Sequence, residues 1–266
     1  MILGFGWGIK GAAVATVIGN VVGALYYLMH FFRKKSFLSI RLSDFAVKDG
    51  IFKDVISIGL SASIANLLVS VSAIVANGQL TKYGDLYVAG YGVTSKILMI
   101  VTLIGIGVGS GVQPFFGYCY GAKNRERLMS GIKVSAIFSM ILCIIVTLIC
   151  FIFAKPIVNV FLTTNVSSSV GVHFTRILMC TAWTIGIFAI CQNALQAMGS
   201  AVFSLLASLF RQGIILVPAM FIMQYFIGVD GLLWAQPVAD VFALFLVIIM
   251  MLYKIKKGLA CENERK

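Results

Sequence analysis

Seven stretches of this sequence are each long and apolar enough to cross the hydrocarbon core of a lipid bilayer. Crossing ~30 Å of hydrocarbon takes ~20 predominantly apolar residues in a helix. Backbone groups in lipid have no water to bind, so each stretch is expected to be an α-helix. The approximate limits are 10–32, 55–80, 86–119, 132–154, 174–198, 201–227 and 230–253. The sequence therefore predicts an all-α integral membrane protein with about seven transmembrane helices.

The small number of charges supports this prediction. Only 11% of the residues are charged and 60% are hydrophobic, whereas soluble domains have about 25% charged residues. The net charge of +12 would suggest a nucleic-acid partner in a soluble protein. Here the basic residues flank the apolar stretches and form no face for reading bases. The expected partner is the lipid bilayer, and no nucleic-acid partner is expected.

The distribution of lysine and arginine predicts the orientation of the chain in the membrane. Basic loops stay on the cytoplasmic side of a membrane. Fifteen basic residues fall on one side of the predicted spans and four on the other. We therefore expect a multi-pass protein of the cell membrane with a cytoplasmic C-terminus. The larger set is Arg33, Lys34, Lys35, Arg41, Lys48, Lys53, Lys123, Arg125, Arg127, Lys133, Lys254, Lys256, Lys257, Arg265 and Lys266; the smaller is Lys10, Lys82, Lys155 and Arg176.

The first and last stretches resemble each other at an offset of 220 residues, which suggests an internal repeat. Gly8, Gly11 and Ala15 correspond to Gly228, Gly231 and Ala235. Such repeats mark many transporters, although small residues are common in membrane helices and coincidence is the alternative interpretation. A repeat, together with a predicted outside N-terminus, favours a missing upstream bundle. The expected division is 1–35 as the last helix of a truncated first lobe, 36–54 as a cytoplasmic linker, 55–253 as a six-helix second lobe and 254–266 as a cytoplasmic tail.

The sequence contains no convincing motif of an enzyme or of a metal site. Gly6, Gly8 and Gly11 fit the G-x-G-x-x-G pattern, but no strand precedes them and a membrane helix follows. There is no G-x-S-x-G elbow and no CxxC pair. The two histidines, His30 and His173, have no ligand spacing. We expect no enzyme activity and no metal site.

Several motifs occur in the order found in one transporter family. The third stretch ends in Gly111-Val112-Gln113-Pro114-Phe115-Phe116-Gly117-Tyr118-Cys119-Tyr120-Gly121-Ala122. This resembles the "QP…GYNYGA" signature of the multidrug and toxic compound extrusion (MATE) family, with Cys119 where Asn is usual. Gln196 to Gly199, Ser208 to Gln212 with Pro218, and Gly228 to Asp240 resemble three later motifs of that family.

The resemblance covers nearly the whole chain and implies a fold and a function. The family has two six-helix lobes, and this chain resembles the sixth helix plus the complete second lobe. The implied function is secondary transport, in which drugs or other amphiphilic organic compounds are exported in exchange for protons or sodium ions, without another cofactor. The alternatives are a lipid-linked oligosaccharide flippase of the same superfamily and a non-transporting truncated membrane subunit. The missing first lobe or a second copy of the chain is an expected partner.

Three charged residues lie deep within predicted spans, where charge is costly and often functional. Asp240 lies ten residues past Asp230, or ~15 Å along a helix. Arg211 lies in the neighbouring span and Lys96 in the third. A structural ion pair between Asp240 and Arg211 is the favoured interpretation, and binding of the coupling ion is the alternative. Lys96 either shares this depth or reaches towards the outer headgroups.

Uncharged residues complete the candidates for transport or gating. Gln192 and Gln196 in the fifth span, with Asn77 in the second, either line a watery cavity or bond to adjacent helices. Gly111, Gln113 and Pro114 in the third span and Pro237 in the last span serve either helix packing or a gating hinge.

Overall fold

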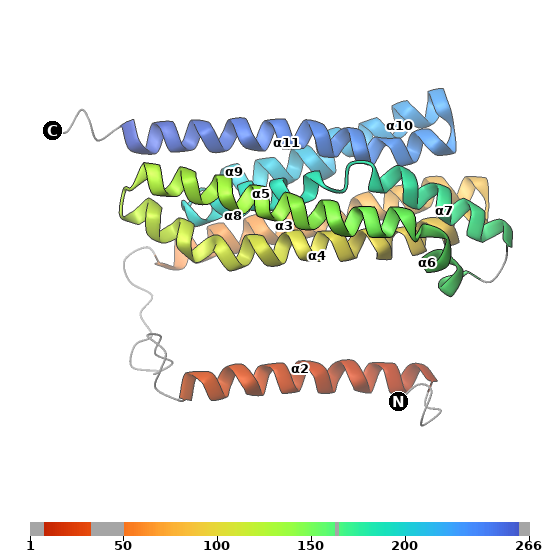
Figure 1. Ribbon diagram of the computed structural model, residues 1–266, viewed down its shortest axis with the longest axis horizontal. Coiled ribbons are helices and arrows are strands. Elements are labelled where there is room, and N and C mark those ends of the chain that lie inside the picture. The colour runs from red at the N-terminus through yellow and green to blue at the C-terminus, as the bar shows by residue number, and fades with distance from the viewer. Residues whose placement is uncertain (1–7, 33–50, 163–164, 261–266) are drawn as a thin grey trace. The chain divides into compact units, whose positions relative to one another are not determined.

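A computed structural model describes residues 8–32, 51–162 and 165–260 of the chain (Figure 1). The regular structure of these residues is entirely helical, as the sequence predicts. The elements are α2 (Gly8–Phe32), α3 (Ile51–Leu80), η2 (Thr81–Tyr83), α4 (Asp85–Gly121), α5 (Arg125–Ile152), α6 (Ala154–Phe161), α7 (Asn165–Met179), α8 (Thr184–Ala197), α9 (Ala201–Ser208), η3 (Leu209–Ile215), α10 (Leu216–Ile227) and α11 (Val229–Ala260).

The chain forms two compact units, Met1–Lys53 and Asp54–Lys266. The first contains α2, an apolar helix whose side chains are mostly exposed within its own unit. Residues 33–50, which hold most of the predicted linker, lie outside the described residues. The assignment of α2 to the end of a truncated first lobe stays a prediction.

Five helices of the described residues are long and apolar enough to span a membrane, and α7 with α8 makes a sixth if the bent pair is one span. The first predicted span corresponds to α2, whose shorter apolar stretch is Ala13–Met29. Several helices extend beyond the apolar limits predicted for their spans, among them α7, which begins at Asn165. The α5 helix begins at Arg125, because the Asn124 side chain accepts a hydrogen bond of 2.9 Å from the Arg127 amide. The α11 helix extends to Ala260, so residues 254–260 of the predicted tail are helical.

The fifth span is not the single helix that the sequence predicts. It consists of α7 and α8, which meet at an angle of 50°. Across the break, the Cys180 amide bonds to the Ile177 carbonyl, three residues back instead of four. The α8 side of the break is held by close packing, since a Cβ at Gly186 would lie 2.8 Å from Ser139 Oγ of α5. Tertiary packing therefore sets the direction of α8, and neither proline nor glycine marks the break itself.

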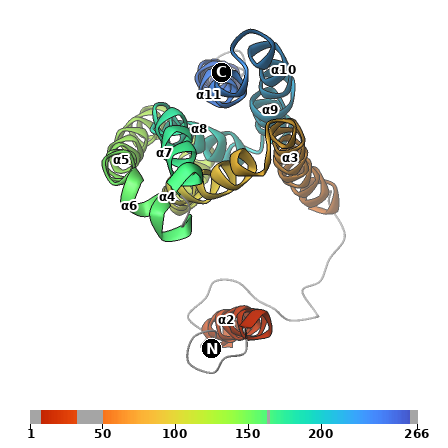
Figure 2. The same cartoon turned by 90° about the vertical axis from the view of Figure 1, so that its right-hand side faces the viewer.

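The α8 helix is the centre of the second unit. Its side chains pack with α4, α5 and α11 in one core cluster that includes Phe188, Ile190 and Leu195. A second cluster joins α7, α10 and α11 to the C-terminal half of α3 through Ala76 and Leu80. Seen end-on, α3 and α5 lie on opposite sides of this unit (Figure 2).

Candidate functional site

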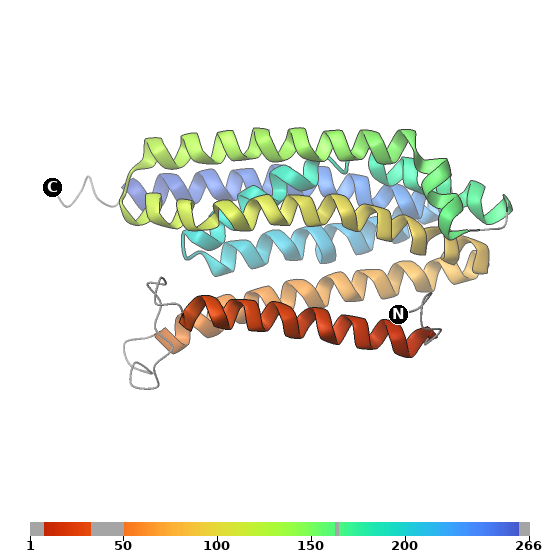
Figure 3. The same cartoon turned by 60° about the horizontal axis from the view of Figure 1, so that its bottom comes forward.

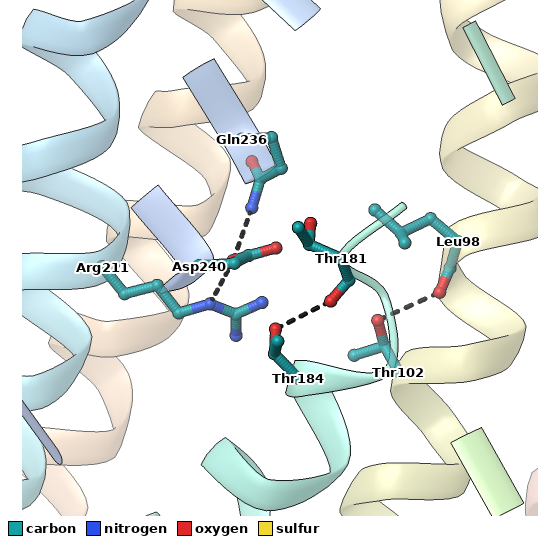
Figure 4. A network of polar contacts seen from close by, with 7 residues as sticks. All are labelled: Leu98, Thr102, Thr181, Thr184, Arg211, Gln236 and Asp240. Carbon is teal, nitrogen blue, oxygen red and sulfur yellow. Dashed lines mark hydrogen bonds and ion pairs between the residues drawn. The ribbon is translucent and has the colours of Figure 1, made fainter. Parts of the chain in front are cut away.

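A buried ion pair joins two helical elements of the second unit. The Arg211 Nε donates to Asp240 Oδ1 over 2.8 Å, and the Gln236 amide donates to the same oxygen over 3.1 Å (Figure 4). Side-chain exposure is 4% for Asp240 and 14% for Arg211. Two of the three deep charges predicted from the sequence are therefore in direct contact. A carboxylate at this depth is compensated by a cation and an amide, as burial requires.

A π-helix presents Arg211 to its partners. The segment η3 (Leu209–Ile215) is a π-helix between α9 and α10, and such segments occur frequently at functional sites. The Arg211 guanidinium carbon lies 4.7 Å from the centre of the Phe188 ring on α8, within the range of a cation–π interaction. One guanidinium thus links the π-helix to α8 and α11.

The irregular backbone of η3 is also tied to α3. Ser72 Oγ lies 2.6 Å from the Gln212 carbonyl oxygen and 2.9 Å from the Leu68 carbonyl oxygen of its own helix. Ser72 is buried. In a membrane helix, a backbone carbonyl that loses its α-helical hydrogen bond can accept one from a side-chain hydroxyl instead. This contact places α3 next to the residue that follows Arg211.

The break between α7 and α8 lies in the same polar region. Figure 4 shows Thr181 and Thr184 of the break in the close-up with Asp240 and Arg211. Thr184 Oγ1 donates to the Thr181 carbonyl over 2.7 Å, and the Thr181 hydroxyl has no hydrogen-bond partner among the described residues. A broken helix beside buried polar groups is the arrangement from which many transporters build their sites.

The predicted polar stripe of α8 bonds to the adjacent helix. Gln192 Nε2 donates to Ser208 Oγ over 2.8 Å, and Gln196 Nε2 donates to Ser204 Oγ over 3.0 Å. The sequence left open whether Gln192 and Gln196 line a watery cavity or bond to an adjacent helix. In the structure both side chains bond to α9. Asn77 is separate from this group, since its amide donates to the Ala73 carbonyl on its own helix over 2.8 Å.

The remaining predicted residues lie apart from the ion pair. Lys96 is exposed on α4 and makes no hydrogen bond or ion pair with any described residue. The α4 helix runs unbroken past Gly111, Gln113 and Pro114 to Gly121. Pro237 is buried inside α11, three residues before Asp240. The hinge role of these residues stays a prediction.

Sequence reasoning did not identify two partners of the pair, Gln236 and Phe188, or the contact of Ser72 with η3. Gln236 lies one turn before Asp240, so the i, i+4 spacing on α11 could have indicated it. Phe188 lies in the apolar run of the predicted fifth span, where the sequence does not distinguish it from other core residues. Nothing in the sequence indicated the role of Ser72. Its contact with the Gln212 carbonyl depends on the π-helix, and the sequence of that span is typical of an ordinary apolar helix.

Comparison with known proteins places this fold in a family. Residues 62–222, more than half of the chain, match the MatE family model. The chain belongs to the MatE family. The predicted resemblance is confirmed, and MatE proteins are membrane transporters and not enzymes.

Two curated relatives of this MatE chain are called multidrug export protein MepA. The protein of Staphylococcus saprophyticus is 25% identical over 263 residues, which is 99% of this chain and 58% of the relative. The protein of Staphylococcus aureus strain N315 is 25% identical over 264 residues, with the same coverage. The chain thus spans somewhat more than half the length of these relatives.

Solved structures of MATE transporters share the fold. A MATE structure in complex with MaL6 has a TM-score of 0.88 at 21% sequence identity. The match covers 97% of this chain and 59% of the chain in that structure. An outward-facing multidrug resistance MATE transporter of the MOP superfamily has a TM-score of 0.87 at 22% identity, covering 97% and 58%. The likeness at this identity establishes the MatE fold for nearly the whole chain.

Proposed function

We propose that this chain forms part of a secondary active transporter that exports drugs or other amphiphilic compounds in exchange for protons or sodium ions. The main support for this proposal is the match of residues 62–222 to the MatE family model. In addition, relatives named multidrug export proteins align with 99% of the chain. The mechanism is alternating access, in which one lobe rocks against another around a central site.

In this proposal the Arg211–Asp240 pair has a structural role. The acidic side chains that the structure describes are Asp85, Glu126, Asp230 and Asp240, and the first three lie in the first turns of α4, α5 and α11. Asp240 is already compensated by Arg211 and Gln236. Carboxylates that bind a cationic drug or the coupling ion then come from a partner lobe, supplied by a further segment or by a second copy of the chain.

The charges of the described residues do not favour the flippase alternative. A wide, basic cavity would favour it, and Lys96 and Arg211 are the deep cations that could make a cavity basic. Because Asp240 lies 2.8 Å from Arg211, the charge of that guanidinium is neutralised within its own lobe. Lys96 alone leaves too small a positive excess to favour an anionic, lipid-linked sugar.

The proposed orientation has a cytoplasmic C-terminus. The turn between α4 and α5, with Arg125 and Arg127, lies at the same end of the second unit as the C-terminal end of α11, with Lys254 and Lys256 (Figures 1 and 3). Grouped basic residues favour the cytoplasmic side. Labelling of Cys261 by a membrane-impermeant maleimide is expected in inverted vesicles and not in intact cells; the reverse pattern would overturn this orientation.

Ethidium efflux tests the transport proposal. Cells that express the chain with any adjoining coding sequence from its own genome are expected to accumulate less ethidium than cells with an empty vector. An uncoupler abolishes the difference if protons are exchanged, and removal of external sodium abolishes it if sodium is. Ethidium accumulation equal to the vector control, despite verified membrane insertion, would contradict the proposal.

A further inference from the structure

A small apolar pocket lies where α5 passes the break between α7 and α8. Its volume is about 250 Å³, and its wall includes Thr147 and Phe151 of α5, Met179 of α7, and Cys180 and Trp183 of the break. None of these residues contacts Arg211 or Asp240 through a described polar interaction. The residues that line the pocket are therefore distinct from those that form the buried ion pair.

The pocket opens beside a face of α5 that suits lipid chains. Ile141, Ile145, Ile149 and Ile152 recur at helical spacing and are between 47% and 66% exposed. Leu148, which is 53% exposed, belongs both to this face and to the pocket wall. In a bilayer, such a face is covered by acyl chains, so the molecules that reach the pocket first are membrane lipids.

A cation that has no counter-ion among the described residues lies at the rim of the pocket. The guanidinium carbon of Arg176, in the last turn of α7, lies 5.7 Å from the centre of the Phe151 ring. Phe151 itself lines the pocket. Arg176 is exposed and forms no ion pair with any carboxylate in the described part of the chain. The charge at the rim therefore favours a ligand with an anionic group, since a guanidinium binds phosphate oxygens in a bidentate way.

A buried hydroxyl lies one helical turn deeper. Thr147 is 8% exposed, lines the pocket, and its Oγ1 has no hydrogen-bond partner among the described residues. It precedes Phe151 by four residues, or ~6 Å along α5. An unpaired buried hydroxyl is costly in an apolar medium. In a glycerophospholipid, the glycerol backbone separates the phosphate from the ester carbonyls, which lie deeper in the membrane. This separation allows the phosphate to lie at Arg176 while an ester carbonyl accepts a hydrogen bond near Thr147.

From this geometry we propose that the pocket binds an anionic phospholipid, with its phosphate on Arg176 and one acyl chain beside Trp183. The charge at the rim selects the headgroup, the apolar wall holds the chain, and the Thr147 hydroxyl donates to an ester carbonyl. The lipid occupies the seam between α5 and the broken span, where it stabilises the angle between α7 and α8.

Trp183 provides a direct readout, because bromine atoms on an acyl chain quench tryptophan fluorescence at close contact. The other tryptophans are Trp7 and Trp234, so a Trp7→Phe/Trp234→Phe variant of the full chain reports on Trp183 alone. It is reconstituted in phosphatidylcholine vesicles that contain equal fractions of either brominated phosphatidylglycerol or brominated phosphatidylcholine. One basic residue is expected to give the anionic lipid a preference of about fivefold in apparent binding at Trp183.

A matched pair of variants separates the rim charge from a general charge effect. Arg176→Gln is expected to remove the preference for phosphatidylglycerol. Arg127→Gln is the control, because Arg127 lies 5.9 Å from the ring centre of Phe115 in a similar contact on α5, and this variant should keep the preference. Thr147→Val, which has nearly the same shape, should reduce quenching by both lipids.

Equal quenching by the two brominated lipids, a preference that survives Arg176→Gln, or loss of the preference in Arg127→Gln would overturn the proposal. Loss of the preference when soluble glycerol phosphate is added would also overturn it, because a phosphate site without a lipid chain would then suffice. If the double tryptophan variant does not fold, the thermal unfolding of the unaltered chain in detergent replaces quenching. Phosphatidylglycerol must then raise its midpoint, and must not raise that of Arg176→Gln.

Discussion

Two carboxylates on α11 contact basic side chains in opposite environments. Asp240 contacts Arg211 over 2.8 Å, with side-chain exposures of 4% and 14%. Asp230 contacts His173 Nε2 over 3.0 Å at the start of the same helix, with exposures of 48% and 57%. The distances are nearly equal, so distance alone does not rank the two contacts. The comparison teaches that burial and additional partners decide how much each pair contributes.

The environments predict very different energies. Removing one partner of a buried pair leaves an uncompensated charge and costs about 3–5 kcal/mol. An exposed pair contributes about 0–1 kcal/mol, because water and salt screen the charges. Arg211 also contacts the ring of Phe188, and Asp240 accepts from Gln236. At the N-terminal end of α11, by contrast, the pair borders an open pocket of about 380 Å³ that is lined by Tyr87, His173 and Asp230 among others.

The largest effect is expected from breaking the buried pair on one side. Arg211→Gln leaves the Asp240 carboxylate buried without its cation, and should lower the midpoint of thermal unfolding in detergent by about 10 °C. Asp240→Asn should act similarly. His173→Gln is the matched control at the exposed pair. Equal midpoints for Arg211→Gln and His173→Gln would show that burial does not distinguish the two sites.

Removing both partners of the buried pair sharpens the same comparison. The double variant Arg211→Gln/Asp240→Asn buries no charge, so it should be more stable than the sum of the single changes by about 2–3 kcal/mol. The measurement is a double-mutant cycle on unfolding in detergent. Additive effects would mean that the two residues act independently, and would remove the structural role proposed for the pair.

Packing, more than charge, is expected to hold the N-terminal end of α11. Gly231 directly follows Asp230, and a Cβ there would overlap the Met223 carbonyl oxygen of α10. Gly231→Ala should therefore force the α10–α11 hairpin apart, at a cost of about 1–3 kcal/mol. The comparison variant is Asp230→Asn, one residue earlier. If Asp230→Asn lowers the unfolding midpoint more than Gly231→Ala, the charge contributes more than the close helix contact.

The sequence predicts the membrane helices well, because hydrophobic length is a property that each segment carries by itself. It also predicts which charges lie deep, since Asp240 and Arg211 are far from any span end. The break between α7 and α8 and the π-helix at η3 were not predictable. Both depend on contacts between helices, such as Gly186 against Ser139 and Ser72 against the Gln212 carbonyl. The break at residues 180–183 contains neither proline nor glycine, and Gly213 within η3 does not by itself indicate a π-helix, because glycine is common in membrane helices.

The smallest effect is expected from the exposed pair, and salt distinguishes it from the buried one. His173→Gln and Asp230→Asn should each change stability by about 0–1 kcal/mol, with a coupling within that range. Surface charges are screened within ~3 Å at 1 M salt, whereas buried pairs are screened much less. At a pH low enough to protonate His173, the coupling between His173 and Asp230 should therefore vanish at high salt, while that between Arg211 and Asp240 persists. A coupling between His173 and Asp230 that is large and independent of salt would mean that these side chains are shielded from water, for example by a molecule bound in the adjoining pocket.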